Sequence, residues 1–594
     1  MENSTQLTPP KNLIRPTVIF LCLLLVVAVW GYFVAVADPI FKNYDAAEFA
    51  VVARNLLRGK GFTTDVYWMW VRDYGALNHP EDTWPPMQII LAAVAFALFG
   101  VKINVFYGMI ICSLIALLLA VYVISASLFD KWDGLVASTM LFTSPILIKL
   151  TSAGSNDVGA TFFYICAMYA LYKSFDEKSR LKWLILGAIF TGLSILEKFQ
   201  GVLIVISYTI WQLCSFYRLP KDVIKKSVLF FVVILIVGAP LMVRNYRVFG
   251  QITYPTSKLL NAIAASWDPL DNRWRMGMVF NRLYWEHEQP SYSYLAKHRG
   301  LRYLLYDRPK FEIKRWAKYN LNGIIMPQLF LFLGIFGIFL SWKTHRRWCL
   351  WCILTMLCSL SYVIFGQMEP RYFLFFNPLM AIFSARFLFF LGKRIARFSP
   401  VVAVLFILIF AWLFFRQGFS SWKAGVTMNP ARRYFVERFT MAGKWLEKNL
   451  KPNEGVVTLF TAQMCFLIDR GGAVYPNVDL ARFIVLADKY KLKYLMLNNL
   501  QNFLNLFKRP GTEHWLLRQL APLYMGIESY GFKLEYQDGK NFIIYRIPKP
   551  NEVDLESLPT LPPEPYDFTI LLLEPNRGGL KEKPPPLNLE PLNP

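Results

Sequence analysis

Two carboxylates near the start of the chain have a spacing that suits joint chemistry. Asp45 and Glu48 lie three residues apart in the segment FKNYDAAEFAVVARNLLRGKGF, whose pattern predicts a helix running to about Gly59. Residues three apart share one face of a helix, where a carboxylate can accept a proton from a nucleophile. Helix capping is the alternative, because an acid followed three residues later by Glu before an apolar run is also a capping pattern.

Other polar residues stand in very short segments between long apolar runs. They are Asn156 and Asp157 in TSAGSND, Glu197 and Lys198 in LEKFQ, Glu369 and Arg371 in QMEPRY, and Arg244 and Arg247 in RNYRVFG. Charges close to the hydrocarbon boundary are costly and often functional, although snorkelling of Lys and Arg is a common alternative. Acidic and basic groups that converge on one cleft suit a reaction that ionises a nucleophile and expels an anion.

The apolar runs themselves identify the class of protein. Of the 594 residues, 55% are hydrophobic and 18% are charged. Runs of 18 or more apolar residues are long enough to cross roughly 30 Å of hydrocarbon as helices. We expect about eleven spans, and hence an α-helical polytopic membrane protein. The expected spans are 17–37, 103–128, 133–150, 158–173, 181–196, 200–217, 227–243, 324–341, 348–366, 372–391 and 400–415.

Two apolar stretches differ in length from an ordinary span or signal peptide. The stretch at 87–99 is short for a span, so we expect it to lie at the interface or to re-enter. AVA before Asp38 resembles a signal-peptide cleavage site. The first run, however, has an apolar core of about 20 residues, longer than the usual 7–15. We therefore expect an uncleaved anchor, with residues 1–16 in the cytoplasm.

The distribution of Lys and Arg predicts the orientation, because basic residues concentrate in cytoplasmic loops. With the N-terminus inside, seventeen basic residues fall on that side, against two, Lys198 and Arg371, in the short outer loops. The seventeen are Lys11, Arg15, Lys131, Lys173, Lys178, Arg180, Lys182, Arg218, Lys221, Lys225, Lys226, Lys343, Arg346, Arg347, Lys393, Arg394 and Arg397. They also explain much of the net charge of +24 without a nucleic-acid partner.

Three larger segments then face outward, namely 38–102, 244–323 and everything after about 416. Residues 430–546 alternate helix-like and strand-like patterns, which predicts a small extracytoplasmic α/β domain. Residues 547–594 are rich in proline and lack apolar periodicity, so we expect an extended or disordered tail.

An ordered set of motifs resembles a known family. The set comprises DAAEFAVVARNLLRGKGF, WPPMQIILAAVAFALFG, the SND loop, GLSILEKFQG, RNYRVFG and EPRYFLFFNPLMAIF. In this order they resemble GT-C type glycosyltransferases that use polyprenyl-phosphate sugars, especially the protein O-mannosyltransferase and lipid A aminoarabinose transferase group. The resemblance covers roughly residues 17–415, and residues 430–546 resemble the soluble cap of bacterial members.

The resemblance implies roles for three acids. The position matching the family's general base is Asp45, with Glu48 beside it, and a second family acid matches Asp157. The chain departs from the family in two places. Two alanines separate its carboxylates, where many members have adjacent Asp-Glu. Trp84 precedes Pro85-Pro86, where the aminoarabinose branch has a lysine that holds the carrier phosphate.

The phosphate must then be bound by other cations. We expect Arg244, Arg371 and Lys198, in that order, to stabilise the leaving lipid phosphate, and direct displacement predicts inversion at the anomeric carbon. The chain has no Gly-rich phosphate loop, GxSxG or HExxH motif, in keeping with a lipid-linked donor. No metal ligands are assigned, and a divalent metal stays an open alternative.

The resemblance further implies an integral protein of the cytoplasmic (inner) membrane whose acceptor is a cell-envelope lipid, glycan or protein. Two alternatives remain. An O-antigen-type polymerase or ligase would share the large outer loops but would not need the acidic helix at Asp45. A transporter or flippase would place ionisable residues at mid-membrane depth and show internal repeats; the spans are nearly free of charge.

The loop charges make a direct prediction about orientation. A reporter that is active only outside the cytoplasm should be active when fused after residue 420 and inactive when fused near Lys225 or Arg346. Activity of the two inner fusions, with none at 420, would overturn the orientation and the proposed clustering of outer loops.

Overall fold

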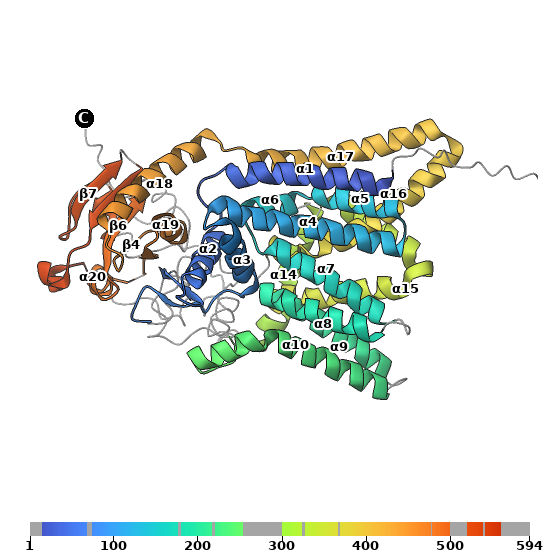
Figure 1. Cartoon of the computed structure of the whole chain (residues 1–594), viewed down its shortest axis with the longest axis horizontal. Helices are drawn as coiled ribbons and strands as arrows, with labels where there is room; N and C mark the ends of the chain where they lie inside the picture. Colours follow the sequence, from blue (N-terminus) through green and yellow to red (C-terminus); the bar gives the residue numbers. More distant parts are fainter. Residues whose placement is uncertain are drawn as a thin grey trace, which may run out of the picture.

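Long helices occupy one end of the molecule and a mixed β-sheet the other (Figure 1). The computed structural model describes residues 15–67, 74–175, 180–216, 220–253, 300–322, 327–365, 369–476, 478–498, 519–524, 526–538 and 541–559. Most of the loop 244–323 and the tail beyond 559 lie outside this part, so the tail prediction is not tested there.

Each expected span overlaps a helix. The helices concerned are α1 (Pro16–Val36), α4 (Ile103–Leu128), α5 (Lys131–Phe142), α6 (Pro145–Ala153), α7 (Asp157–Ser174), α8 (Arg180–Glu197), α9 (Val202–Phe216), α10 (Pro220–Phe249), α15 (Gln328–Phe365), α16 (Phe376–Phe398) and α17 (Pro400–Val426). The spans expected at 324–341 and 348–366 share α15, which is interrupted by non-helical dihedrals at His345.

Not all of these helices are long and apolar enough to cross a membrane by themselves. Among the described residues five are, or six if α5 and α6, bent by 61°, form one span. The chain is therefore a helical integral membrane protein, and the count of eleven stays a prediction. Helices α1, α10 and α17 expose many large apolar side chains, which suits contact with lipid, where a helix satisfies its own backbone hydrogen bonds.

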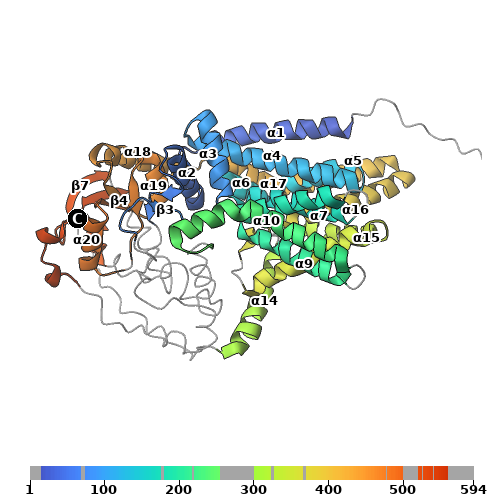
Figure 2. The same ribbon diagram turned by 60° about the horizontal axis from the view of Figure 1, so that its bottom comes forward.

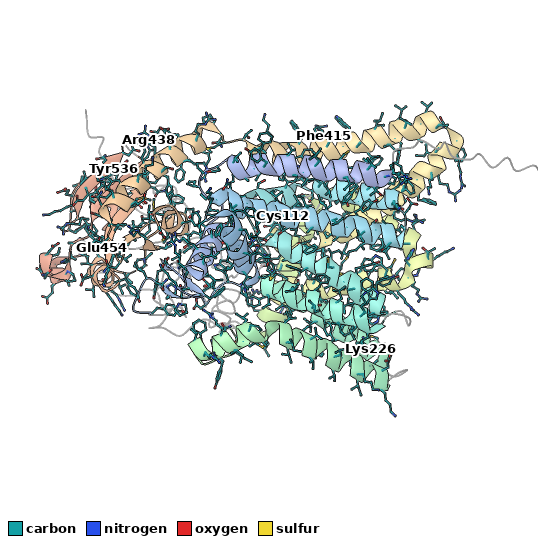
Figure 3. The ribbon with its side chains drawn as sticks, viewed as in Figure 1. Cys112, Lys226, Phe415, Arg438, Glu454 and Tyr536 are labelled. Atoms are coloured by element: carbon teal, nitrogen blue, oxygen red, sulfur yellow. The ribbon has the colours of Figure 1, made fainter. Side chains whose placement is uncertain are left out.

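Charged side chains lie at both ends of the molecule (Figure 3). Lys226 lies at the end of the helical bundle away from the sheet, whereas Arg438, Glu454 and Tyr536 lie at the sheet end. Arg438 pairs with Asp538 at 2.6 Å, which joins a helix of the C-terminal segment to an edge strand.

Residues 38–102, the segment expected to be the first outer loop and called so below, fold into helices and short strands. They are α2 (Tyr44–Leu57), β1 (Thr63–Thr64), β2 (Val66–Tyr67), β3 (His79–Pro80) and α3 (Met87–Phe99). The N-cap of α2 is Asn43, whose side chain accepts a hydrogen bond from the backbone N–H of Asp45. The capping alternative for Asp45 is therefore wrong, because Asp45 lies in the first turn and its carboxylate is available for other partners.

The C-terminal segment and the first outer loop share one sheet. The segment forms α18 (Pro430–Asn449), β4 (Gly455–Val457), α19 (Thr461–Ile468), β5 (Gly471–Ala473), α20 (Leu480–Lys489), β6 (Leu492–Asn498), α23 (Ala521–Tyr524), β7 (Lys533–Asp538) and β8 (Phe542–Arg546). The strand order is β2-β5-β4-β6-β8-β7, and β2 pairs in parallel with β5. The view in Figure 2 shows α2, α3 and α19 between the sheet and the membrane helices.

Helices α15 and α16 approach closely at a glycine. A Cβ on Gly337 would lie only 1.9 Å from the backbone oxygen of Phe383, and small residues permit such backbone proximity in membrane bundles. Gly392 on α16, by contrast, has no atom within 4 Å of an added Cβ.

We expect Gly337→Ala to lower the thermal unfolding temperature in detergent, because the two helices must separate and overpacking costs about 1–3 kcal/mol. Gly392→Ala is the matched control and should be neutral or slightly stabilising. Equal unfolding temperatures for the two variants would show that the α15–α16 contact does not limit stability.

Candidate functional site

Loops between the membrane helices meet at one position. Gly154 ends α6 in the left-handed region, with φ of 76°, which glycine adopts without strain, so the chain can turn directly into α7. Asn156 then donates its amide hydrogen to the backbone oxygen of Glu197, 3.0 Å away. This bond fixes the loop before α7 against the end of α8.

An acid and a lysine pair where these loops meet. Lys198 donates to Oδ1 of Asp157, and Ser155 Oγ donates to Oδ2 at 2.5 Å. Asp157 is the first residue of α7, where the helix dipole favours a negative charge. Burial lowers the pKa of Lys198 from its ordinary value, and the Asp157 carboxylate opposes that shift.

A second ion pair joins the first outer loop to the start of the last bundle helices. Nη1 of Arg371, in the short helix η6 (Pro370–Phe373), lies 3.0 Å from Oδ2 of Asp45. Its Nε lies 2.5 Å from Oε2 of Glu369. Residues 326 positions apart in the sequence are thereby brought together, and Arg371 is held between two carboxylates.

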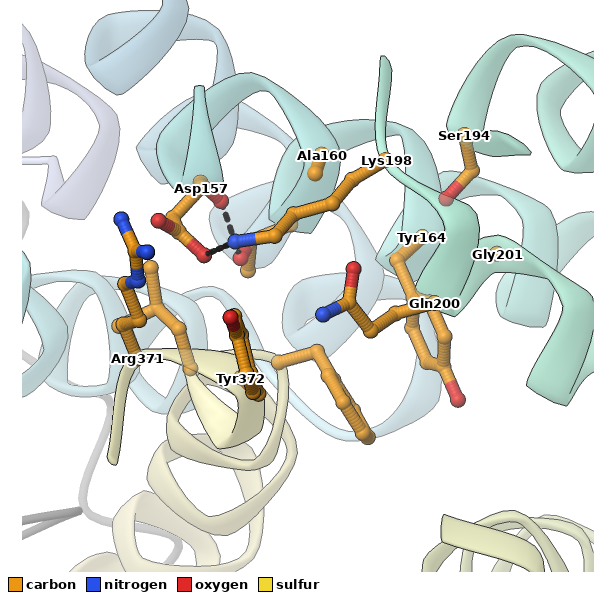
Figure 4. A pocket seen from close by; sticks show the side chains of 12 residues that line it. Asp157, Ala160, Tyr164, Ser194, Lys198, Gln200, Gly201, Arg371 and Tyr372 are labelled. Carbon is orange, nitrogen blue, oxygen red and sulfur yellow. Dashed lines mark hydrogen bonds and ion pairs between the residues drawn. The ribbon is translucent and has the colours of Figure 1, made fainter. Parts of the chain in front are cut away.

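A small cavity opens between these groups (Figure 4). Its walls include Asp157, Lys198, Arg371, Tyr372 and Gln200, the last from the short helix η2 (Phe199–Gly201). The ring of Tyr372 lies 4.8 Å from the Lys198 ammonium and 5.4 Å from the Arg371 guanidinium. Two cations and an acid thus face one cavity, and Arg371 connects it to Asp45.

Glu48 and Arg244 do not line this cavity. Oε2 of Glu48 accepts a hydrogen bond of 2.7 Å from the Trp84 indole, and among the described residues its Oε1 has no hydrogen-bond partner. Arg244 donates to the backbone oxygen of Phe62 at 3.0 Å and lies over that ring. Of the six candidate residues, Asp157, Lys198 and Arg371 line this cavity, whereas Asp45, Glu48 and Arg244 do not. That all six act at one cleft stays a prediction.

Trp84 has a clear structural role. Where the aminoarabinose branch has a lysine, this chain places an indole that donates to a buried carboxyl group. Burial, followed by the charge of Glu81, raises the pKa of Glu48 well above its ordinary value. Trp84 thus contacts a cluster of buried acids, Glu48 and Glu81, beside helix α2.

Glu81 is a member of this cluster that sequence reasoning missed. Its Oε1 accepts hydrogen bonds from the backbone N–H groups of Thr83 at 2.7 Å and Trp84 at 3.0 Å. Burial, and then the neighbouring Asp82, raise the pKa of Glu81 to about 7. Nothing in the local sequence EDTWPP distinguishes Glu81 from a solvated acid, because its burial results from packing against distant segments.

Glu197 was expected in a short loop at the membrane boundary, but its side chain is buried at the end of α8. Its side chain is fully buried, and within the described part of the chain both carboxyl oxygens lack a hydrogen-bond partner. A Cβ on Gly159 would lie 2.8 Å from one of them, so glycine leaves the room this side chain occupies. Within the same part of the chain, no three His, Cys, Asp or Glu residues lie close enough to hold a metal ion.

Known proteins resemble this chain in part of the sequence and in the fold. The profile of the dolichyl-phosphate-mannose-protein mannosyltransferase family matches residues 80–243. No curated protein matches the sequence.

Two solved structures share the fold. One is ArnT from Cupriavidus metallidurans, bound to undecaprenyl phosphate, with 13% identity and a TM-score of 0.54 over 89% of this chain and 98% of that chain. The other is the oligosaccharyltransferase AglB from Archaeoglobus fulgidus, in complex with an inhibitory peptide and a dolichol-phosphate, with 14% identity and a TM-score of 0.55 over 90% and 74%. The resemblance to GT-C type polyprenyl-phosphate-dependent glycosyltransferases is therefore confirmed.

The raised pKa of Glu81 predicts how stability depends on pH. The unfolded chain loses this proton near pH 4.3, whereas the folded chain keeps it until about pH 7. Between these values the folded state binds more protons, so its stability falls as pH rises through this window. Glu81→Gln keeps an acceptor oxygen but cannot ionise. We expect it to raise the thermal unfolding temperature relative to wild type at pH 8 and to have a smaller effect at pH 5.

The control for this measurement is Glu437→Gln, which alters an exposed acid of α18. It should leave the thermal unfolding temperature unchanged at both pH 5 and pH 8. A Glu81→Gln protein that loses stability as steeply as wild type between pH 5 and 8 would contradict the assignment.

Proposed function

We propose that the protein is an inverting glycosyltransferase that moves a sugar from a polyprenyl-phosphate carrier to an acceptor on the non-cytoplasmic face. The observation that carries this proposal is the cavity where Asp157, Lys198 and Arg371 meet, with Asp45 in contact with Arg371. Such a reaction needs a base for the acceptor hydroxyl and cations for the departing phosphate, and these groups provide both.

Asp45 is the proposed general base. Its half-buried carboxylate lies in the first turn of α2, 3.0 Å from the Arg371 guanidinium, and Arg371 lines the cavity. The acceptor oxygen then attacks the anomeric carbon, the bond from that carbon to the phosphate oxygen breaks, and the proton passes to Asp45. A single displacement inverts the anomeric centre.

Arg371 and Lys198 are the proposed holders of the phosphate. A guanidinium grips two phosphate oxygens at once, whereas an ammonium supplies a single point of charge. The donor phosphate would compete with Asp45 and Glu369 for Arg371, so donor binding would release the Asp45 carboxylate toward the acceptor. Arg244 ranks below these two because it lies outside the cavity.

The position of the charges supports transfer over transport. Asp45, Asp157 and Arg371 lie in first turns or short helices at the ends of long helices, and Lys198 directly follows α8. A transporter is expected to hold its substrate near mid-membrane depth. A site at helix ends instead suits a donor whose lipid tail stays in the membrane and whose phosphate reaches the interface.

We expect two kinetic signatures from purified protein in nanodiscs, assayed for transfer from polyprenyl-phosphate sugars. Asp45→Asn should lower kcat by about 10²–10⁴-fold, the usual contribution of a general base, and leave the donor KM unchanged or lower, because Asp45 no longer competes with the phosphate for Arg371. Arg371→Lys should raise the donor KM, and Arg371→Ala should raise it further, because the two-point grip on the phosphate is lost.

Lys102→Ala is the control, since Lys102 is an exposed cation before α4 and away from the cavity. Wild-type kcat in Asp45→Asn would exclude it as the base. Failure of the wild-type protein to bind or use any polyprenyl-phosphate sugar would overturn the proposed function as a whole.

A further inference from the structure

Helix α2 is held at its two ends by different parts of the molecule. At its start Asp45 pairs with Arg371, and Ala46 packs against the turn before α7, where a Cβ on Gly154 would lie 3.0 Å from the Ala46 Cβ. Near its end, Arg54 reaches the C-terminal segment. The helix therefore bridges the cavity and the sheet.

Arg54 lies buried in this bridge, with 2% of its side chain exposed. Its Nη2 lies 3.3 Å from Oδ2 of Asp65, and its Nη1 lies 2.9 Å from Oδ1 of Asp469. The same Nη1 donates to the backbone oxygens of Cys465 at 3.1 Å and Phe466 at 3.3 Å. One guanidinium thus joins the first outer loop to helix α19.

These contacts satisfy groups that would otherwise be costly to bury. The last carbonyl groups of a helix have no partner within the helix, and a cation near them is favoured by the helix dipole. Cys465 and Phe466 lie in the last turn of α19. The backbone oxygen of Asp65 accepts from the N–H of Gly472 at 3.0 Å, so Arg54 lies where α2, α19 and the edge of the sheet meet.

Arg58 provides a matched comparison one turn further along the chain. It contacts the same Asp469 through two bonds of 2.6 Å, but its side chain is 45% exposed. Exposed ion pairs contribute little, because water screens them. If charge pairing at Asp469 were all that mattered, the two arginines would be equivalent.

We propose that Arg54 is a positioning residue, which fixes α2 against α19 and the sheet and thereby sets the place of Asp45 relative to Arg371. The inference rests on the proposed function, because it acts through the proposed base. Arg54 lies nine positions after Asp45, roughly 13.5 Å along the helix axis, and a helix transmits a shift at one end to the other. Misplacement of a reacting group by about 1 Å can cost about 10²-fold in rate.

The first test compares three variants of the full-length protein in nanodiscs. Arg54→Gln should lower kcat by about 10–100-fold with the donor KM within about twofold of wild type. Arg54→Lys should recover part of the loss, because an ammonium still reaches a helix end. Arg58→Gln should match wild type. Equal losses in Arg54→Gln and Arg58→Gln would overturn the inference.

The second test asks whether Arg54 acts through Asp45, using a double-mutant cycle with Asp45→Glu. When two sites this far apart act independently, the fold-loss of kcat in the double variant equals the product of the two single fold-losses to within roughly twofold. A combined loss that departs at least fivefold from the product of the single losses supports the inference. A double-variant loss equal to the product of the single losses indicates that Arg54 has only a general structural role, and it overturns the inference.

Two further outcomes are distinguishable. If Arg54→Gln does not fold, Asp469→Asn, which removes a partner at the surface, takes its place in the cycle with the same criteria. If Asp45→Asn and Asp45→Glu both keep wild-type activity, the assignment of the base fails and the positioning role fails with it. An inactive Asp45→Asn with a simple product in the cycle overturns the positioning role alone.

Discussion

The site depends on one constraint, that a charge near the hydrocarbon boundary needs a partner. An isolated ion there is costly, and a buried ion pair is tolerated only with good geometry and further hydrogen bonds. Lys198 meets this requirement with Asp157, and Arg371 meets it with Asp45 and Glu369. Because the partners come from separate loops, pairing them brings those loops together around one cavity.

The C-terminal segment depends on the same loops. Strand β2 comes from the first outer loop and completes the edge of the sheet beside β5. The sheet, α19 and α2 therefore form one packed unit, and Arg54 lies inside it. A soluble cap linked to the membrane part only through α17 would leave α2 free to move, whereas here the cap limits where α2 can lie.

The comparison structures share this fold at low identity, so similarity of function has to be argued from the site. ArnT was solved with undecaprenyl phosphate and AglB with a dolichol-phosphate. In this chain two cations and the Asp157 carboxylate line the cavity, and Arg371 joins it to Asp45; the proposed phosphate-linked donor is argued from this arrangement. At Trp84 the chain has an indole that donates a hydrogen bond to the buried Glu48.

The sequence by itself determined the membrane class, the helix positions and most of the polar residues that meet at the cavity. Long apolar runs allow few other structures, and the outer loops are so short that their charges must lie near the membrane surface. The pairing of Asp45 with Arg371 and of Asp157 with Lys198 could not be read from the sequence, because it depends on which loops become neighbours. The same reason explains three features that local sequence patterns did not indicate. Glu48 and Arg244 contact Trp84 and Phe62, Glu81 is buried, and a two-residue strand of the first loop joins the C-terminal sheet. Each of these features depends on contacts between segments far apart in the chain, and local residue patterns do not predict such contacts.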